Sequence, residues 1–275
     1  TDVLLRVLDA AIQDLASIQT KEDAQKLAIR SHDIATYLGR LRSRDDLPRE
    51  QLARREYQVL PLLGFRESSG LAIHQIMSED PFFFVDILCN VFLPANRDKS
   101  GEGEPNEVER ERAQSAYRLL DGMKILPGQG KEGEIDESAL IEWIDAVRKL
   151  AREQDRSTVA DIQIGHLLAH SPDDPDDGGW PHRNVRNVFE KIGSSVDIGR
   201  GLIVERFNMR GPYWKDLYEG GKQERGLTNQ YREWAQLSRS EWPRIADILD
   251  KIAEDWHREA LRADQEAEQD KLDLG

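Results

Sequence analysis

The chain has 275 residues, and its 52 acidic against 38 basic side chains give a formal net charge of −14. Because nucleic-acid phosphates and anionic membranes bind cationic surfaces, this charge argues against both as default partners. The single cysteine, Cys89, excludes an internal disulfide and a four-cysteine zinc site, and it fits a reducing compartment. No apolar run approaches the ~20 residues of a membrane-spanning helix, so we expect a cytoplasmic protein.

Apolar residues recur every three to four positions through the first third of the chain, which predicts amphipathic helices. We expect these helices at residues 2–18, 20–41, 48–60 and 67–77. Asp80 followed by Pro81 predicts another helix start, since Asp caps helices and Pro fits their first turn. Apolar side chains cover nearly the whole circumference of that helix. It should therefore be the buried central helix of an N-terminal lobe, residues 1–93.

Residues 94–106 are polar and rich in Gly and Pro, which predicts a linker or mobile loop. Beyond it we expect a C-terminal helical lobe, residues 107–275, with helices beginning near residues 107, 136, 157, 181, 196, 222 and 240. The last of these helices carries an apolar seam, made of Trp242, Ile245, Leu249, Ile252, Trp256 and Ala260. Past Leu261 the apolar seam stops, which predicts a solvated or frayed acidic end.

No segment alternates apolar and polar residues as a half-buried strand would. We therefore expect an all-α fold of about ten helices, in an orthogonal bundle or a solenoid-like array. Two lobes are compatible with this pattern.

Histidines and aspartates cluster between residues 166 and 182. His166 and His170 would share one face of a helix, and Asp174 and His182 follow closely. Two imidazoles and a carboxylate can hold a divalent metal, so these four residues are candidate metal ligands. Leu167 stands where zinc-protease helices have Glu, and the Asp spacing does not match a calcium loop. We favour instead a helix end whose His170 meets the helix dipole, followed by a solvated acidic turn.

A glycine-rich segment, residues 128–133, matches the literal glycine pattern of dinucleotide-binding loops. That motif needs a strand before it, but the preceding residues 123–127 are too few and end in Pro. Glu134 and Asp136 would also lie where the phosphates bind. We interpret the segment as an ordinary loop, and we expect no cofactor other than the divalent metal considered above.

Two loop segments mix polar, aromatic and glycine residues, a composition typical of binding surfaces and also of tight turns. The residues that we single out as a candidate binding surface are Trp180, Arg210, Tyr213, Trp214, Gln223 and Arg225.

The sequence contains no catalytic motif in its proper structural context. The leading hypothesis is therefore a non-catalytic helical interaction or scaffold domain, which binds a protein or another domain of its parent chain. One alternative is a metal-dependent hydrolase or nuclease that uses the cluster of His166, His170, His182 and residues 173–177. A further alternative is a nucleic-acid-binding module, which would need a contiguous basic surface from residues 30–55 and 183–210.

Five segments also carry a family resemblance: residues 79–85, 180–182, 210–225, 231–235 and 242–249. They resemble the C-terminal helical region of large, uncharacterised bacterial multidomain proteins, and the similarity runs over about residues 57–268. The resemblance implies a domain of unknown function, cut from a larger cytoplasmic protein of bacterial origin. It assigns no activity and no catalytic residue.

Overall fold

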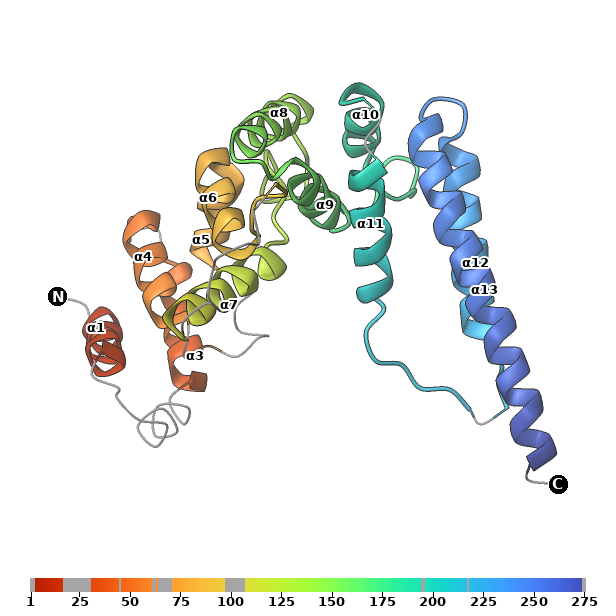
Figure 1. The fold of residues 1–275 in the computed structure, drawn as a ribbon, viewed down its shortest axis with the longest axis horizontal. Coiled ribbons are helices and arrows are strands. Elements are labelled where there is room, and N and C mark those ends of the chain that lie inside the picture. Colours follow the sequence, from red (N-terminus) through yellow and green to blue (C-terminus); the bar gives the residue numbers. More distant parts are fainter. Residues whose placement is uncertain are drawn as a thin grey trace. The chain divides into compact units, whose positions relative to one another are not determined.

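A computed structural model of the chain describes residues 3–16, 31–44, 46–60, 63, 71–96, 107–193, 196–216 and 218–273. Within these residues the protein is built of twelve helices and has no strand, apart from one isolated bridge between Gln129 and Ile135 (Figure 1). The all-α prediction is therefore confirmed. None of the described helices is long and apolar enough to cross a membrane.

The described helices, in chain order, are α1 (Val3–Ala16), α3 (Ser31–Arg42), α4 (Arg49–Val59), α5 (Ala72–Glu79), α6 (Pro81–Val91), α7 (Glu107–Gly122), α8 (Glu137–Glu153), α9 (Ser157–Leu168), α10 (Arg183–Lys191), α11 (Val196–Asn208), α12 (Lys222–Ser238) and α13 (Pro243–Asp273).

The chain divides into two compact units. Unit 1 comprises Thr1–Pro127 and Trp143–Ala160, and unit 2 comprises Gly128–Glu142 and Asp161–Gly275. This division differs from the expected boundary at residues 94–106, most of which lies outside the described residues. Helix α7, which follows that segment, packs on α6 within unit 1, because its apolar face needs a partner there.

In unit 1, α6 begins as the sequence predicts. The Asp80 side chain accepts a hydrogen bond from the Phe82 amide at 2.9 Å, and Pro81 is the first helical residue. The Phe84 ring packs edge-to-face on Trp143 at 4.8 Å. Yet Phe82 is 68 % exposed, so the predicted burial around the helix is wrong on that side. Only the face formed by Phe84, Val85, Ile87 and Leu88 is buried.

Unit 1 also buries a carboxylate, paired with a partly exposed arginine, and a histidine. Glu56 accepts hydrogen bonds from Arg42 Nε at 2.9 Å and from the Ile73 amide, near the start of α5, at 3.0 Å. Burial raises the pKa of Glu56, although Arg42 and the α5 amides lower it in part. Burial and the charge of Arg42 lower the pKa of the neighbouring His74 to about 4.

In unit 2, helices α9 and α11 cross at unusually short distance. A Cβ atom on Gly165 would lie 2.1 Å from the Ile198 carbonyl oxygen, and one on Gly201 would lie 2.1 Å from that of Ile162. Only glycine fits at either position, because such a contact is a steric clash for any other residue. The two glycines therefore set how closely the backbones of α9 and α11 approach.

Helices α12 and α13 pair along their lengths in a hairpin (Figure 1). The predicted seam of α13 is confirmed in the packing, with Ile245, Leu249, Ile252, Trp256 and Ala260 all buried. The helix continues to Asp273, so the acidic end is helical rather than frayed, although most of its side chains face solvent.

Candidate functional site

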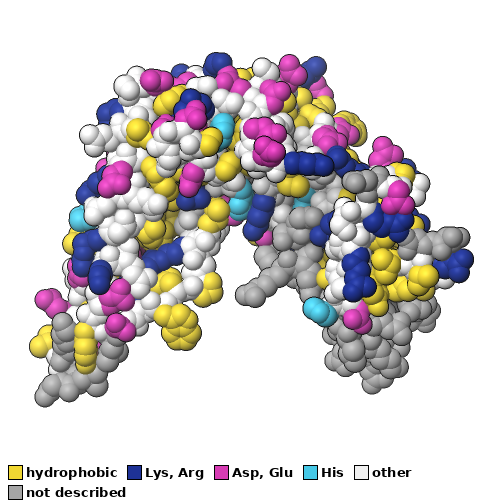
Figure 2. Space-filling view, turned by 180° about the vertical axis from the view of Figure 1, so that it is seen from behind, with side chains coloured by type: hydrophobic (Ala, Val, Ile, Leu, Met, Phe, Trp, Pro, Cys, Tyr) yellow, Lys and Arg dark blue, Asp and Glu magenta, His cyan; other side chains and the backbone are white. Residues whose placement is uncertain are grey.

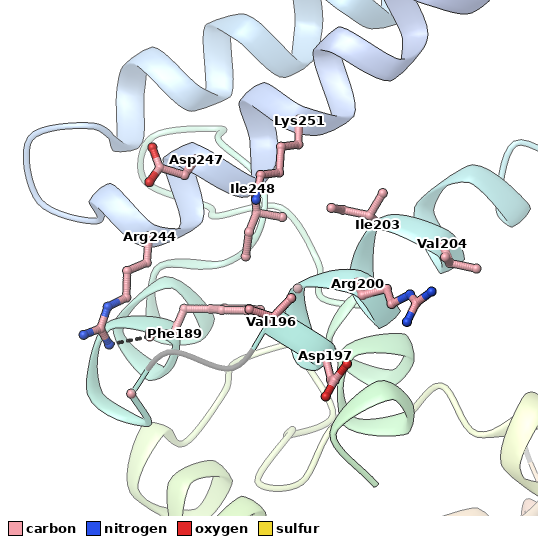
Figure 3. Close-up of a pocket in the computed structure, with 12 residues that line it drawn as sticks. Phe189, Val196, Asp197, Arg200, Ile203, Val204, Arg244, Asp247, Ile248 and Lys251 are labelled. Atoms are coloured by element: carbon pink, nitrogen blue, oxygen red, sulfur yellow. Dashed lines mark hydrogen bonds between the residues drawn. The ribbon is translucent and has the colours of Figure 1, made fainter. Parts of the chain in front are cut away.

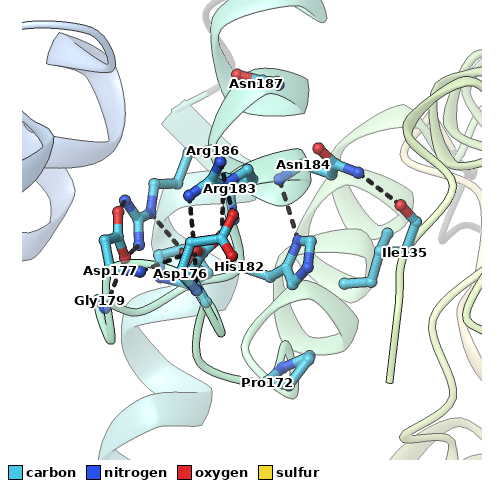
Figure 4. Close-up of polar contacts among 12 residues, drawn as sticks. Ile135, Pro172, Asp176, Asp177, Gly179, His182, Arg183, Asn184, Arg186 and Asn187 are labelled. Atoms are coloured by element: carbon cyan, nitrogen blue, oxygen red, sulfur yellow. Dashed lines mark hydrogen bonds and ion pairs between the residues drawn. The ribbon is translucent and has the colours of Figure 1, made fainter. Parts of the chain in front are cut away.

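The acidic loop between α9 and α10 is organised by one buried carboxylate (Figure 4). Asp174, which is 1 % exposed, accepts five hydrogen bonds: from the amides of Asp176, Asp177 and Arg183 and from two nitrogens of the Arg183 guanidinium. Burial raises the pKa of Asp174, but the hydrogen bonds hold it well below its usual range. The carboxylate therefore serves as an internal cap for this loop.

The structure does not bring the four predicted metal ligands together. His182 caps α10, since its Nδ1 accepts a hydrogen bond from the Asn184 amide at 3.2 Å. His170 Nε2 lies 3.0 Å from Glu205 Oε1. No group of three His, Cys, Asp or Glu side chains that could hold a metal occurs in the described part of the chain. The four predicted ligands, His166, His170, His182 and Asp174, thus form no ligand set in this structure. Asp174 accepts hydrogen bonds from three amides and the Arg183 guanidinium, and His182 Nδ1 accepts one from an amide.

A buried arginine that the sequence analysis did not single out completes this loop (Figure 4). Arg186 is fully buried and binds Asp177 through two hydrogen bonds of 2.7 and 2.9 Å. Its Nε donates to the Pro181 carbonyl at 2.6 Å, and its guanidinium lies 5.0 Å from the centre of the Trp242 ring. The available signal was an arginine that follows Val185 and stands three residues before Phe189 on an amphipathic helix.

Trp180, predicted as part of a binding surface, is a core residue. It is 1 % exposed, and its indole N–H donates to the Ser171 carbonyl at 2.9 Å. The Arg206 guanidinium lies 4.1 Å above its ring and also donates to the Tyr231 hydroxyl at 2.9 Å. An indole needs both an apolar environment and an acceptor when buried, and this site supplies them. The prediction for Trp180 is therefore wrong.

The other predicted binding residues lie around the connection between α11 and α12. Arg210 and Tyr213 line a pocket of about 560 Å³ together with Lys215, Glu224 and Trp256. Glu224 is 1 % exposed; Arg210 Nη1 lies 2.7 Å from its Oε1 and Lys215 Nζ 2.8 Å from its Oε2. Burial raises the pKa of Glu224, but Lys215 and Arg210 lower it overall. The carboxylate is thus held in its charged form between two cations.

Aromatic side chains cover the same cations. The Arg210 guanidinium lies 3.4 Å from the centre of the Tyr213 ring and 5.0 Å from that of Trp256. On the other side, Trp256 stacks on Phe207 at 4.2 Å. The floor of the pocket is therefore a rigid set of rings and paired charges.

Trp214 is the most exposed aromatic side chain of this region, with 94 % of its surface in solvent. One hydrogen bond nevertheless restrains its backbone, because its carbonyl accepts from Gln223 Nε2 at 2.8 Å. Arg225 pairs with Asp264 at 2.6 Å, and Asp264 also accepts the Gly221 amide at 2.8 Å. Gln223 thus ties the segment that carries Trp214 to the start of α12, whereas Arg225 and Asp264 tie the start of α12 to α13. We call residues 209–216 the aromatic loop.

A second pocket in unit 2, of about 500 Å³, lies between α11 and α13 (Figure 3). Phe189, Ile203 and Ile248 give it an apolar floor, and the 82 % exposed Val196 stands at its edge. Its charged residues have both signs, Arg200, Arg244 and Lys251 with Asp197 and Asp247. The sequence analysis missed this pocket, whose only signal was exposed valines on α11.

Unit 1 has a pocket of about 490 Å³ of its own, lined by Tyr57, Ile76, Phe83 and Ile87 and by charged residues of α4 and α6. Like the α11–α13 pocket, it mixes an apolar floor with charges of both signs. Neither pocket holds an arrangement that selects one ligand.

The basic segments considered for nucleic-acid binding are largely neutralised within the chain. In residues 30–55, Arg42, Arg44, Arg49 and Arg55 pair with Glu56, Asp46, Glu79 and Asp9. In residues 183–210, Arg183, Arg186 and Arg210 pair with Asp174, Asp177 and Glu224. Figure 2 shows acidic and basic side chains interspersed over the visible face. This distribution does not favour a phosphate-binding surface, which needs uncompensated cations.

No family model, no curated protein and no solved structure is significantly similar to this chain.

Proposed function

We propose that the chain is a non-catalytic interaction module of a larger bacterial protein, and that it binds a protein partner through the aromatic loop and the adjoining pocket. The observation that carries the proposal is Trp214, whose residue is 94 % exposed and whose backbone carbonyl is held by a hydrogen bond from Gln223. Trp is the residue type most enriched where binding energy concentrates in protein interfaces.

The energetics of Trp214 support this role. Leaving a large apolar side chain in water forgoes about 1.5–3 kcal/mol of burial free energy, which a partner could recover by covering it. The fixed backbone also lowers the conformational entropy lost on binding. The adjoining pocket offers a partner a concave surface beside the protruding ring.

The state of the buried ionisable groups supports a non-catalytic role. Glu56, Asp174 and Glu224 are each bound to at least one cation. A general base needs a free lone pair within reach of a substrate, and these carboxylates use theirs internally. His182 likewise uses its Nδ1 as a helix cap.

A comparison of captured proteins tests the proposal. Wild-type chain, Trp214→Ala and Phe82→Ala would each be cross-linked in native lysate, and bound proteins quantified by mass spectrometry. Phe82 is the matched control, since it is also an exposed aromatic residue but lies on α6 of unit 1. We expect Trp214→Ala alone to lose a defined set of proteins. Identical sets for all three chains would contradict the proposal.

A further inference from the structure

We propose that the pocket beside the aromatic loop accepts a cationic protein segment, one whose lysine or arginine side chains contact Trp214 and the acidic wall of α13. This inference rests on the proposed function, because it names the chemistry of the partner for the same surface.

The first step is that the pocket has no free cation for an anionic ligand. Arg210 and Lys215 are both bound to the buried Glu224, at 2.7 and 2.8 Å. The third lining cation, Arg262, binds Glu259 at 3.0 Å. Glu224 therefore fills the place that a ligand carboxylate or phosphate would otherwise take. An anionic ligand could bind only by displacing Glu224. The fold already holds Glu224 in place, so its ion pairs cost no further conformational entropy, whereas those of a bound ligand would.

The C-terminal part of α13, beside the pocket, carries an excess of negative charge. Counted over all faces of the helix, residues 254–273 include eight acidic side chains against three basic ones. The lining of the pocket itself has three of each sign, Glu224, Glu259 and Glu266 with Arg210, Lys215 and Arg262. Glu266 lines the pocket, is exposed, and has no ion pair or hydrogen bond with any residue that the structure describes. Surface potentials of one sign attract partners of the opposite sign and repel those of the same sign. The unpaired Glu266 and the acidic C-terminal part of α13 consequently favour a cationic segment over an acidic one or a nucleic acid.

The third step is the chemistry of the exposed ring. The face of an indole attracts ammonium and guanidinium groups more strongly than any other aromatic side chain does. The Trp214 ring is almost wholly in solvent, so its faces are accessible. The same pocket already contains one such contact, because the Arg210 guanidinium lies over Tyr213. A lysine or arginine of the partner would place its cation over the Trp214 ring in the same way.

Fluorine NMR on the whole chain tests the inference. The chain would be labelled with fluorotryptophan, and the Trp214 resonance assigned by its loss in Trp214→Phe. It would then be titrated with a short arginine-rich peptide and with a matched peptide in which glutamate replaces every arginine. We expect the arginine peptide to shift the Trp214 resonance and to bind about tenfold or more tightly than the glutamate peptide.

The dependence on charge provides a second readout. Raising the salt concentration from about 50 to about 200 mM should weaken binding of the arginine peptide severalfold, because screening acts on exposed charges. Glu266→Gln should weaken it about two- to threefold. Asp247→Asn is the matched control, since Asp247 is an exposed acid of α13 that lines the other pocket. It should leave the affinity unchanged.

Three results would overturn the inference: a Trp214 resonance that does not respond to the arginine peptide, an equal response to both peptides, or tighter binding of the glutamate peptide. If Trp214→Ala still loses captured proteins under any of these results, the aromatic loop remains an interaction surface and only the charge preference is wrong. If it loses none, the proposed function fails with it.

Discussion

Unit 1 buries the carboxylate of Glu56 and unit 2 buries those of Asp174 and Glu224, each of them at most 1 % exposed. The pKa of Glu56 is raised, because burial outweighs one arginine and the amides at the start of α5. In unit 2 burial also raises the pKa values, but five hydrogen bonds to Asp174 and two cations at Glu224 lower both overall. Equal burial thus gives opposite shifts, and the donors around a carboxylate decide the sign.

The opposite shifts give the two units opposite responses to acid. A carboxylate with a lowered pKa contributes stability that is present above its unfolded pKa and is lost as the pH falls through the folded value. Asp174 and Glu224 therefore stabilise unit 2 near neutral pH and stop doing so in acid. A carboxylate with a raised pKa contributes stability below its unfolded value, and this is lost as the pH rises. Glu56 therefore adds stability to unit 1 only as the pH falls toward 4.5.

Among the buried carboxylates, the largest expected effect comes from removing Asp174, which accepts the most hydrogen bonds. Asp174→Ala leaves the amides of Asp176, Asp177 and Arg183 without their acceptor, so it should lower the free energy of unfolding of unit 2 by about 3 kcal/mol. Urea unfolding followed by hydrogen exchange of α10 amides would measure it.

Asp176→Ala is the control for that experiment. Asp176 also pairs with Arg183, at 2.9 Å, but its side chain is 69 % exposed. Exposed ion pairs contribute little, so the change should stay within about 0.5 kcal/mol. Equal losses for the two variants would show that the internal hydrogen bonds of Asp174 are not what stabilises the loop.

The second prediction concerns His74, the other buried ionisable group of unit 1. Its pKa falls from 6.5 to about 4, so the folded state resists its protonation. The stability it contributes is present above pH 6.5 and is lost as the pH falls toward 4, by up to about 3 kcal/mol. Hydrogen exchange of α5 amides between these pH values should show the loss in wild type and much less of it in His74→Gln.

Comparison with the wild type in that experiment cancels the opposite contribution of Glu56, which both chains share. His257→Gln is the control, because His257 is exposed on α13. It should leave the pH dependence as it is. The same pH dependence of α5 protection in wild type and in His74→Gln would contradict the burial argument.

A third prediction replaces each carboxylate by its neutral isostere near pH 7. Glu224→Gln leaves Arg210 and Lys215 without a counter-charge in a buried site, and should cost about 2 kcal/mol. Glu56→Gln removes a charge that burial already disfavours, and should change stability by no more than about 1 kcal/mol. Thermal unfolding would measure the loss of stability in each variant. A larger loss for Glu56→Gln than for Glu224→Gln would contradict the opposite directions of the two pKa shifts.

Local patterns in the sequence were sufficient for the helices. The cap at Asp80 with Pro81, and the seam of α13 from Ile245 to Ala260, depend on residues only a few positions apart, and both are confirmed. The division into units was not predictable in this way. The division depends on which apolar helix faces pack together, as α7 does on α6. The glycine-rich composition of residues 94–106 carries no information about that packing.

The candidate sites likewise depend on contacts between distant residues, which local sequence patterns do not report. The composition of residues 166–182 could not reveal that Asp174 and His182 accept amide hydrogen bonds, because that depends on the path of the loop. Trp180 and Trp214 both stand in loops rich in Gly and Pro, yet one is 1 % and the other 94 % exposed. The difference arises from partners distant in sequence, Arg206 above Trp180 and none comparable over Trp214 among the described residues.

Of all these substitutions, the one at Trp214 has the smallest expected effect on stability. Trp214→Ala removes a side chain that contributes almost no buried surface, so the free energy of unfolding of unit 2 should change by less than about 0.5 kcal/mol. Trp180→Ala, in contrast, should cost about 3–5 kcal/mol, as large-to-small changes in a core do. Chemical denaturation of both variants would measure the difference. A loss for Trp214→Ala approaching that of Trp180→Ala would mean that the indole stabilises the fold, and its effect on binding would then no longer identify an interaction surface.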